Sequence, residues 1–286
     1  LETLLPRCDH LIFNSLSQWR RHRARLQGLD VEVGLRVNPE HSEVAVPLYD
    51  PCAPGCRLGV RAQELQNVSL EGIDGLHFHT LCEMGVAPLQ RTLKVVEDRF
   101  AAMLKKVRWV NFGGGHHITS PGYDVAALVN LIRDFRQRHD VEVYLEPSEA
   151  IAVGTGVLIT TVLDIIPGDP PCVILDCSVT AHLGDVIEMP FRPEVRGARL
   201  SGEHPHSYRL GGLTCLAGDV LGDYSFAEPL QVGQRLSILD TAHYTTVKTN
   251  NFNGVQLPSL ALYKPSRGTV TLLRRFGYES YRDRLS

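Results

Sequence analysis

Residues 109–117 read Trp-Val-Asn-Phe-Gly-Gly-Gly-His-His, and they give the clearest indication of the fold class. A short apolar run ends in three glycines, and residues 124–138 follow with apolar side chains three and four positions apart. A strand, a glycine turn and an amphipathic helix in this order make one β-α unit. The stretch therefore predicts an α/β fold with a parallel sheet.

The same alternation extends to both sides of this unit. We predict further strands at residues 10–14, 31–37, 75–80 and 141–145, and further helices at residues 15–27 and 88–107. After about residue 150 the pattern changes to short β-rich runs separated by Gly, Pro and Asp, at 156–163, 172–175, 235–239 and 269–273, with a closing helix at 279–285. We therefore predict two domains: an α/β barrel at residues 1–150, and a β-barrel or sandwich domain at residues 151–286.

The number of strands raises a question about the barrel. A complete (β/α)₈ barrel has eight strands, and only five are visible before residue 150. The sequence also begins with Leu1 rather than Met. We therefore expect a TIM-type barrel whose first strands, about three β-α units, are missing from this sequence.

Composition excludes several classes of protein. The 286 residues carry 29 Lys and Arg against 32 Asp and Glu, without a basic tail, which argues against a nucleic-acid partner. The longest apolar stretch, residues 151–166, is interrupted by Gly154, Gly156 and Asp164, so we expect no transmembrane helix and no membrane partner. Seven dispersed cysteines and no signal-peptide pattern predict a cytoplasmic protein.

Polar residues collect where the predicted strands end, which is where barrel enzymes place their active sites. The glycines Gly113, Gly114 and Gly115 can aim backbone N–H groups at an anion, and without a P-loop lysine they suit a cofactor monophosphate. His77 and His79 lie two positions apart and should project to one face. They suit a metal pair, a histidine stacked on an aromatic cofactor, or two hydrogen-bonded core residues.

Two further features complete the set of candidates. Glu146, before Pro147 at a strand end, could hold a positive ring nitrogen or a metal, or be a solvated turn acid. Cys215 lies in the glycine-rich loop 211–219 with Asp219 nearby, and could act as a proton donor or be an incidental loop cysteine. Cys52 and Cys56 form one C-x₃-C pair without a second pair, so we expect no structural zinc.

Taken in order, these motifs resemble the fold-type III pyridoxal-phosphate decarboxylases, the group of ornithine and diaminopimelate decarboxylases. The similar stretches are Gly75-Leu-His-Phe-His-Thr-Leu-Cys82, Gly113–Gly115, Leu145-Glu-Pro147, Cys215 with Asp219, and Ala242-His-Tyr-Thr245. Further stretches, at residues 77–83, 175–182, 185–190 and 215–226, are similar to the carboxynorspermidine (carboxyspermidine) decarboxylase branch. The chain carries Glu149 where ornithine-type enzymes have an arginine, and that branch also has an acid there.

The resemblance implies a cofactor, a reaction and residue roles. The cofactor is pyridoxal 5′-phosphate, and the reaction is decarboxylation of carboxynorspermidine or carboxyspermidine to norspermidine or spermidine in polyamine biosynthesis. His79 stacks on the ring, Glu146 pairs with the ring nitrogen, and Gly113–Gly115 and Tyr244 hold the phosphate. Cys215 returns the proton, and Asp219, Asp185 and Glu188 are candidates for the cationic substrate amines. A homodimer with a shared active site is implied, because the group brings the cysteine and the acid from the neighbouring subunit.

One departure keeps other functions open. The family's Schiff-base lysine lies in a Tyr-Ala-x-Lys-like context that this chain lacks; its lysines are Lys94, Lys105, Lys106, Lys248 and Lys264. We therefore expect the 286-residue chain to be a fragment, or a non-catalytic decarboxylase-like protein. A metal-dependent hydrolase of the amidohydrolase type, which also uses an H-x-H pair in a barrel, is the other alternative.

Overall fold

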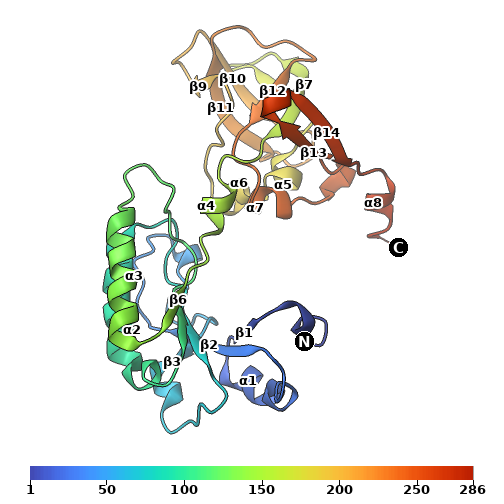
Figure 1. Cartoon of the computed structure of the whole chain (residues 1–286). Coiled ribbons are helices and arrows are strands. Elements are labelled where there is room, and N and C mark those ends of the chain that lie inside the picture. Colours follow the sequence, from blue (N-terminus) through green and yellow to red (C-terminus); the bar gives the residue numbers. More distant parts are fainter. Residues whose placement is uncertain (286) are drawn as a thin grey trace. The chain divides into compact units, whose positions relative to one another are not determined.

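The computed structural model describes residues 1–285, which form two compact units (Figure 1). The first unit is Leu1–Ile151, and the second begins at Ala152 and takes the rest of the chain. Each unit has its own hydrophobic core, one cluster of buried side chains in each.

The first unit is built on a parallel sheet. Its strand order is β1 (His10–Phe13), β2 (Glu32–Asn38), β4 (Gly75–His77), β5 (Trp109–Asn111) and β6 (Glu142–Tyr144), and the two-residue β3 (Val60–Arg61) pairs with the end of β2. The register aligns Arg36 with His77, His77 with Asn111, and Asn111 with Tyr144. The carboxyl ends of β2, β4 and β5 therefore lie in one row, and the loops that follow them meet at one edge of the sheet.

Two long helices cover this sheet. Helices α2 (Val86–Leu104) and α3 (Val125–His139) lie side by side in Figure 1, and their buried side chains share one core cluster with the strands. The Asp124 side chain caps α3 by accepting a hydrogen bond from Ala127 N at 2.8 Å, as expected of an N-cap acid. The shorter helical segments of the first unit are α1 (Leu16–His22) and the 3₁₀ turns Leu5–Arg7, Arg23–Arg25, Pro47–Tyr49 and Ala62–Leu65. Helix α4 (Ser148–Ala152) includes the last residues of the first unit and the first residue of the second.

The second unit is a mixed six-stranded sheet with a separate hairpin. The order is β12 (Arg235–Ile238), β7 (Leu158–Ile166), β8 (Cys172–Leu175), β10 (His206–Gly211), β11 (Val220–Phe226) and β9 (Ala198–Leu200), and all pairs are antiparallel except β8 with β10. Strands β13 (Leu260–Lys264) and β14 (Thr269–Arg274) form the hairpin. The helical segments are α5 (Val179–His182), α6 (Gly184–Glu188), α7 (Tyr244–Val247), α8 (Glu279–Arg282), and the 3₁₀ turns Phe252–Gly254 and Pro265–Arg267.

The structure differs from the predictions in the length of one helix and in several elements that were not predicted. The helix predicted to reach residue 27 ends at His22 and continues as a 3₁₀ turn, because residues 20–25 offer Ala24 as their one apolar side chain for packing. The second unit, predicted as all-β, contains α5, α6 and α7, which are too short to show a helical period. Strands β10 and β11 were not predicted, because they contain Gly, Ser and charged residues among their apolar positions.

Among residues 1–285, no helix combines the length and the apolar character needed to cross a bilayer.

Candidate active site

The glycine loop after β5 fits tightly against its neighbours. A Cβ at Gly113 would lie 2.4 Å from the Phe78 carbonyl oxygen, and one at Gly115 would lie 2.1 Å from that of Leu81. Both glycines have positive φ, +71° and +79°. The loop therefore needs glycine for its conformation and for the close approach of the chain that follows β4.

His79 is fixed against this loop. Its Nδ1 accepts a hydrogen bond from Gly114 N at 3.1 Å, which leaves the proton of the neutral ring on Nε2. Burial, followed by the charges of Arg36 and His77, lowers the pKa of His79. The result is a neutral aromatic ring held in one orientation beside the glycine loop.

Glu146, at the end of β6, is held at both carboxylate oxygens. Asn111 Nδ2 donates to Oε1 at 2.8 Å, and His77 Nε2 lies 3.5 Å from Oε2. The hydrogen bond with His77 is the main reason why the pKa of Glu146 lies below its usual range. Its side chain is still 46% exposed, so an ionised carboxylate remains open to a ligand.

Asn111 connects Glu146 to the glycine loop. While its amide nitrogen donates to Glu146, its Oδ1 accepts from Gly113 N at 2.8 Å. Asn111 itself is 8% exposed. One buried amide therefore sets the distance between the candidate ring-nitrogen partner and the candidate phosphate loop.

A second acid, Glu149, lies near the glycine loop but is paired. Its Oε1 is 2.9 Å from Nε2 of His117, the second residue after the three glycines. The acid that replaces the arginine of ornithine-type enzymes therefore has a histidine partner, and a protonated His117 would offset its charge.

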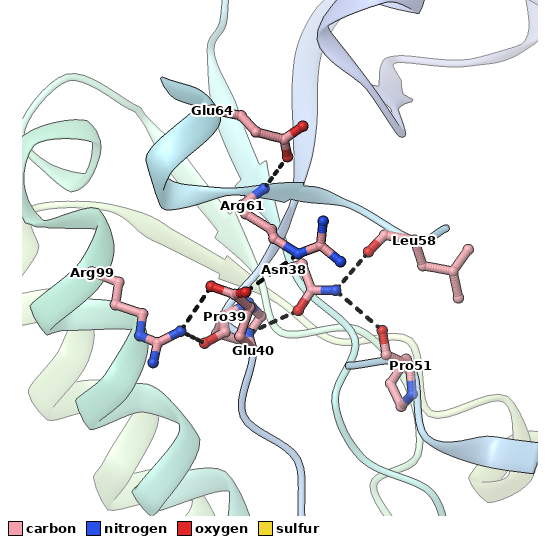
Figure 2. Close-up of polar contacts among 8 residues, drawn as sticks. All are labelled: Asn38, Pro39, Glu40, Pro51, Leu58, Arg61, Glu64 and Arg99. Carbon is pink, nitrogen blue, oxygen red and sulfur yellow. Dashed lines mark hydrogen bonds and ion pairs between the residues drawn. The ribbon is translucent and has the colours of Figure 1, made fainter. Parts of the chain in front are cut away.

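Asn38, the polar residue at the end of β2, forms its hydrogen bonds with nearby backbone groups (Figure 2). Its Nδ2 donates to the carbonyls of Leu58 at 3.0 Å and Pro51 at 3.4 Å, and its Oδ1 accepts from Glu40 N at 2.8 Å. Figure 2 shows Arg61 and Arg99 converging on the Glu40 carboxylate, at 3.3 and 3.1 Å. Asn38 therefore holds the loop that follows β2.

That loop contains the two cysteines of the C-x₃-C pair. Cys52 and Cys56 lie near Arg36, and burial raises the pKa of Cys52 to about 11. A thiol with such a pKa stays protonated at neutral pH and is a poor nucleophile. Among residues 1–285, no group of three or more His, Cys, Asp or Glu side chains is placed to hold a metal ion.

In the second unit, two candidate acids lie on the short helix α6. Asp185 Oδ2 accepts from the Thr245 hydroxyl at 2.7 Å, while its Oδ1 is buried and has no hydrogen-bond partner in the described part of the chain. Glu188 pairs with Lys248 Nζ at 2.5 Å, and this ammonium also lies 5.3 Å from the centre of the Tyr244 ring. Asp185, Glu188 and Tyr244 therefore belong to one local group, formed by α6 and α7.

Cys215 is exposed, in the loop between β10 and β11. Asp219, at the end of this loop, is 4% exposed, and its carboxylate accepts from Val179 N at 2.6 Å, Thr214 N at 3.1 Å and Thr214 Oγ1 at 2.7 Å. The nearby Asp223 pairs through both oxygens with Arg209, at 2.7 and 2.9 Å.

The structure thus groups the predicted residues within each unit. His79, Gly113–Gly115 and Glu146 meet in the first unit, and the second unit holds the α6–α7 group and the Cys215 loop. The roles of Arg36, Asn111 and Lys248 were not predicted from the sequence. A charged residue inside the apolar strand 31–37 was the available signal for Arg36.

Comparison with known proteins identifies the family. Residues 40–242 match the family described as "Pyridoxal-dependent decarboxylase, C-terminal sheet domain". The chain is 48% identical to a carboxyaminopropylagmatine decarboxylase of Synechocystis, across 100% of this chain and 74% of that protein. It is 42% identical to a carboxynorspermidine/carboxyspermidine decarboxylase of Campylobacter jejuni, across 95% of this chain and 73% of that protein.

Solved structures agree with the sequence comparison. The crystal structure of carboxynorspermidine decarboxylase from C. jejuni, complexed with norspermidine, superposes with a TM-score of 0.89 at 40% identity, covering 99% of this chain and 76% of that one. A diaminopimelate decarboxylase structure superposes with a TM-score of 0.82 at 19% identity, covering 99% of this chain and 73% of that one, which shows the shared barrel-plus-sheet fold. The chain belongs to the family of pyridoxal-dependent decarboxylases.

Proposed function

We propose that the protein decarboxylates carboxynorspermidine or carboxyspermidine, with pyridoxal 5′-phosphate as its cofactor, in polyamine biosynthesis in the cytoplasm. The observation that carries the proposal is the geometry around Glu146. An ionised carboxylate, fixed by Asn111 and His77 and still half exposed, lies beside the neutral ring of His79 and the glycine loop.

The residues present fit this cofactor. The glycine loop has no room for side chains but can present backbone N–H groups to a phosphate, which is the basis of many anion sites. His79 offers a neutral face for stacking on the pyridine ring, and Glu146 offers an acceptor for a protonated ring nitrogen. When bound, the cofactor supplies an electron sink for the electron pair that remains on the substrate when CO₂ leaves.

The remaining roles belong to the second unit. Tyr244 contributes a hydroxyl to the phosphate, and Cys215 returns a proton to the substrate α-carbon. By its resemblance to the family, the site combines the glycine loop of one subunit with Cys215 of another, so we propose a homodimer with shared active sites.

Substrate recognition follows from the acids on α6. Asp185 has one oxygen free of hydrogen bonds among the described residues, and Glu188 already holds the ammonium of Lys248. A carboxylate beside an aromatic ring is a suitable environment for an alkylammonium group. A diaminopimelate molecule would instead bring its distal carboxylate to these acids and be repelled.

Carboxyaminopropylagmatine is the second candidate substrate, because the relative named for it is 48% identical to this chain. Its distal group is a guanidinium, which prefers a carboxylate with both oxygens available. Asp185 and Glu188 each have one oxygen in a hydrogen bond or ion pair. This arrangement favours an ammonium over a guanidinium fork.

The test is a substrate comparison with the product of the complete gene. We expect kcat/KM to be highest for carboxynorspermidine or carboxyspermidine, lower for carboxyaminopropylagmatine, ornithine and lysine, and lowest for diaminopimelate. A preference for diaminopimelate would refute the polyamine proposal, and a preference for carboxyaminopropylagmatine would favour the second candidate. Absence of a bound pyridoxal chromophore would refute the cofactor assignment and support a non-catalytic protein.

A further inference from the structure

The loop that carries Cys215 is held from both sides by one residue. Thr214, which precedes the cysteine, donates to the Asp219 carboxylate through its backbone N–H and its hydroxyl, at 3.1 and 2.7 Å. Leu216, which follows it, accepts from the backbone N–H of Asp219 at 2.9 Å. The backbone on either side of Cys215 therefore depends on Asp219.

The same carboxylate connects this loop to another segment. Asp219 Oδ1 accepts from the N–H of Val179, the first residue of α5, at 2.6 Å. Helix α5 leads directly into α6, which carries Asp185 and Glu188. Asp219 thus joins the loop of the proposed proton donor to the segment of the proposed amine-binding acids.

The environment of Asp219 requires a side chain that only accepts hydrogen bonds, as an ionised carboxylate does. Three donors converge on it, two backbone N–H groups and one hydroxyl, and the side chain is 4% exposed. An amide at this position would turn its NH₂ toward a backbone N–H, so one donor would lose its acceptor. The close packing continues at Gly212, where a Cβ would lie 2.4 Å from Asp219 Oδ2.

These contacts leave Asp219 little capacity for a substrate. Its two oxygens already accept three of the about four hydrogen bonds that a carboxylate can take, and the side chain is 4% exposed. We propose that Asp219 is a positioning residue, which fixes Cys215 relative to the α5–α6 segment and does not contact the substrate amine. This inference rests on the proposed function, because it assigns Cys215 to proton return.

The experiment compares Asp219→Asn with Asp223→Asn in the complete holoenzyme. Asp223 is a matched control, because its partner is the exposed Arg209 and its loss should leave the Cys215 loop intact. The first measurement is the rate at which N-ethylmaleimide modifies Cys215, followed by peptide mass spectrometry in the absence of substrate. The second is the separate determination of kcat and KM for carboxynorspermidine or carboxyspermidine.

For Asp219→Asn we expect a changed rate of Cys215 modification, because the exposed thiol lies on a backbone that Asp219 no longer holds in one conformation. We expect kcat to fall about 10–100-fold with KM nearly unchanged, because the proton donor is misplaced while no amine contact is lost. Asp223→Asn should leave the rate of Cys215 modification, kcat and KM unchanged. A raised KM with unchanged kcat and unchanged Cys215 modification would overturn the proposal and make Asp219 an amine ligand.

A milder pair of variants covers the case in which Asp219→Asn does not fold. Thr214→Val removes one of the three donors and should change the rate of Cys215 modification, whereas Thr214→Ser keeps the hydroxyl and should retain the original rate. Equal modification rates in wild type, Thr214→Val and Thr214→Ser would overturn the proposal. The labelling result needs no turnover, so failure of the proposed substrate does not affect it.

Discussion

Asn111→Asp tests the connection between Glu146 and the glycine loop. The new carboxylate can still accept from Gly113 N, but it places a second negative group where an amide donated to Glu146 at 2.8 Å. The lost hydrogen bond to a charged group is worth about 1.5–3 kcal/mol, and roughly half of this at a site as exposed as Glu146. Repulsion between the carboxylates adds about 1–4 kcal/mol, depending on the local dielectric. Together these contributions predict a loss of about 2–5 kcal/mol in the free energy of unfolding of the first unit near pH 8.

The pH dependence gives this prediction a second signature. In wild type the pKa of Glu146 is depressed, so its contribution is present above the unfolded pKa and is lost as pH falls through the folded one. In the variant, the two carboxylates together bind a proton more tightly in the folded state, so the penalty applies at high pH and disappears as pH falls. The deficit relative to wild type should therefore shrink toward acidic pH.

Urea unfolding followed by tryptophan fluorescence measures this deficit. Both tryptophans, Trp19 and Trp109, are buried in the first unit, so the signal reports on that unit. Asn67→Asp is the control, because it makes the same change at an exposed site and should stay within about 0.5 kcal/mol of wild type. A variant at Asn111 as stable as this control, or a deficit that grows toward acidic pH, would refute the reasoning.

Three further predictions address the glycine loop and the chemistry. Gly115→Ala should lower the free energy of unfolding by more than about 3 kcal/mol or prevent folding, because its Cβ would meet the Leu81 carbonyl oxygen. Gly122→Ala is the control, because Gly122 has a similar φ and open space around it, and it should lower the free energy of unfolding by about 1 kcal/mol in the same assay. Cys215→Ala in the product of the complete gene should retain the cofactor absorbance but lose most of the turnover, and loss of the bound chromophore would contradict the assigned role. The 286-residue chain by itself should release no CO₂ from carboxynorspermidine, because none of its five lysines lies in the family's Tyr-Ala-x-Lys context; measured turnover would disprove this.

The parallel sheet could be predicted because its signals are local. Each of its main strands is a short apolar run, and the helices between them carry apolar residues at regular intervals, as in Leu89, Leu93 and Val96 of α2. The glycine loop and Glu146 could be placed at one edge because parallel strands point their carboxyl ends the same way. Helices α5–α7 could not be predicted, because segments of four or five residues obtain their stability from tertiary contacts rather than from periodicity.

The hydrogen-bond partners of the polar side chains could not be predicted from the sequence for a different reason. Asn38 and Asn111 both stand at the end of a strand, and nothing in the local sequence distinguishes their roles. The structure uses the amide of Asn38 to hold the loop after β2, and the amide of Asn111 to hold Glu146. These bonds connect residues 20 and 35 positions apart, and no local pattern records them.

Partners that are distant in the sequence also determine which acids of the second unit are available to a substrate. The resemblance offers Asp185, Glu188 and Asp219 as three carboxylates for a cationic substrate. In the fold, Glu188 is paired with Lys248, and Asp219 accepts from three donors of its own chain. The buried carboxylate oxygen without a hydrogen-bond partner among the described residues is Oδ1 of Asp185. Under the proposed function, we therefore expect selectivity for an ammonium-bearing substrate to depend on the positions of the few carboxylate oxygens left without a partner, rather than on the number of acids.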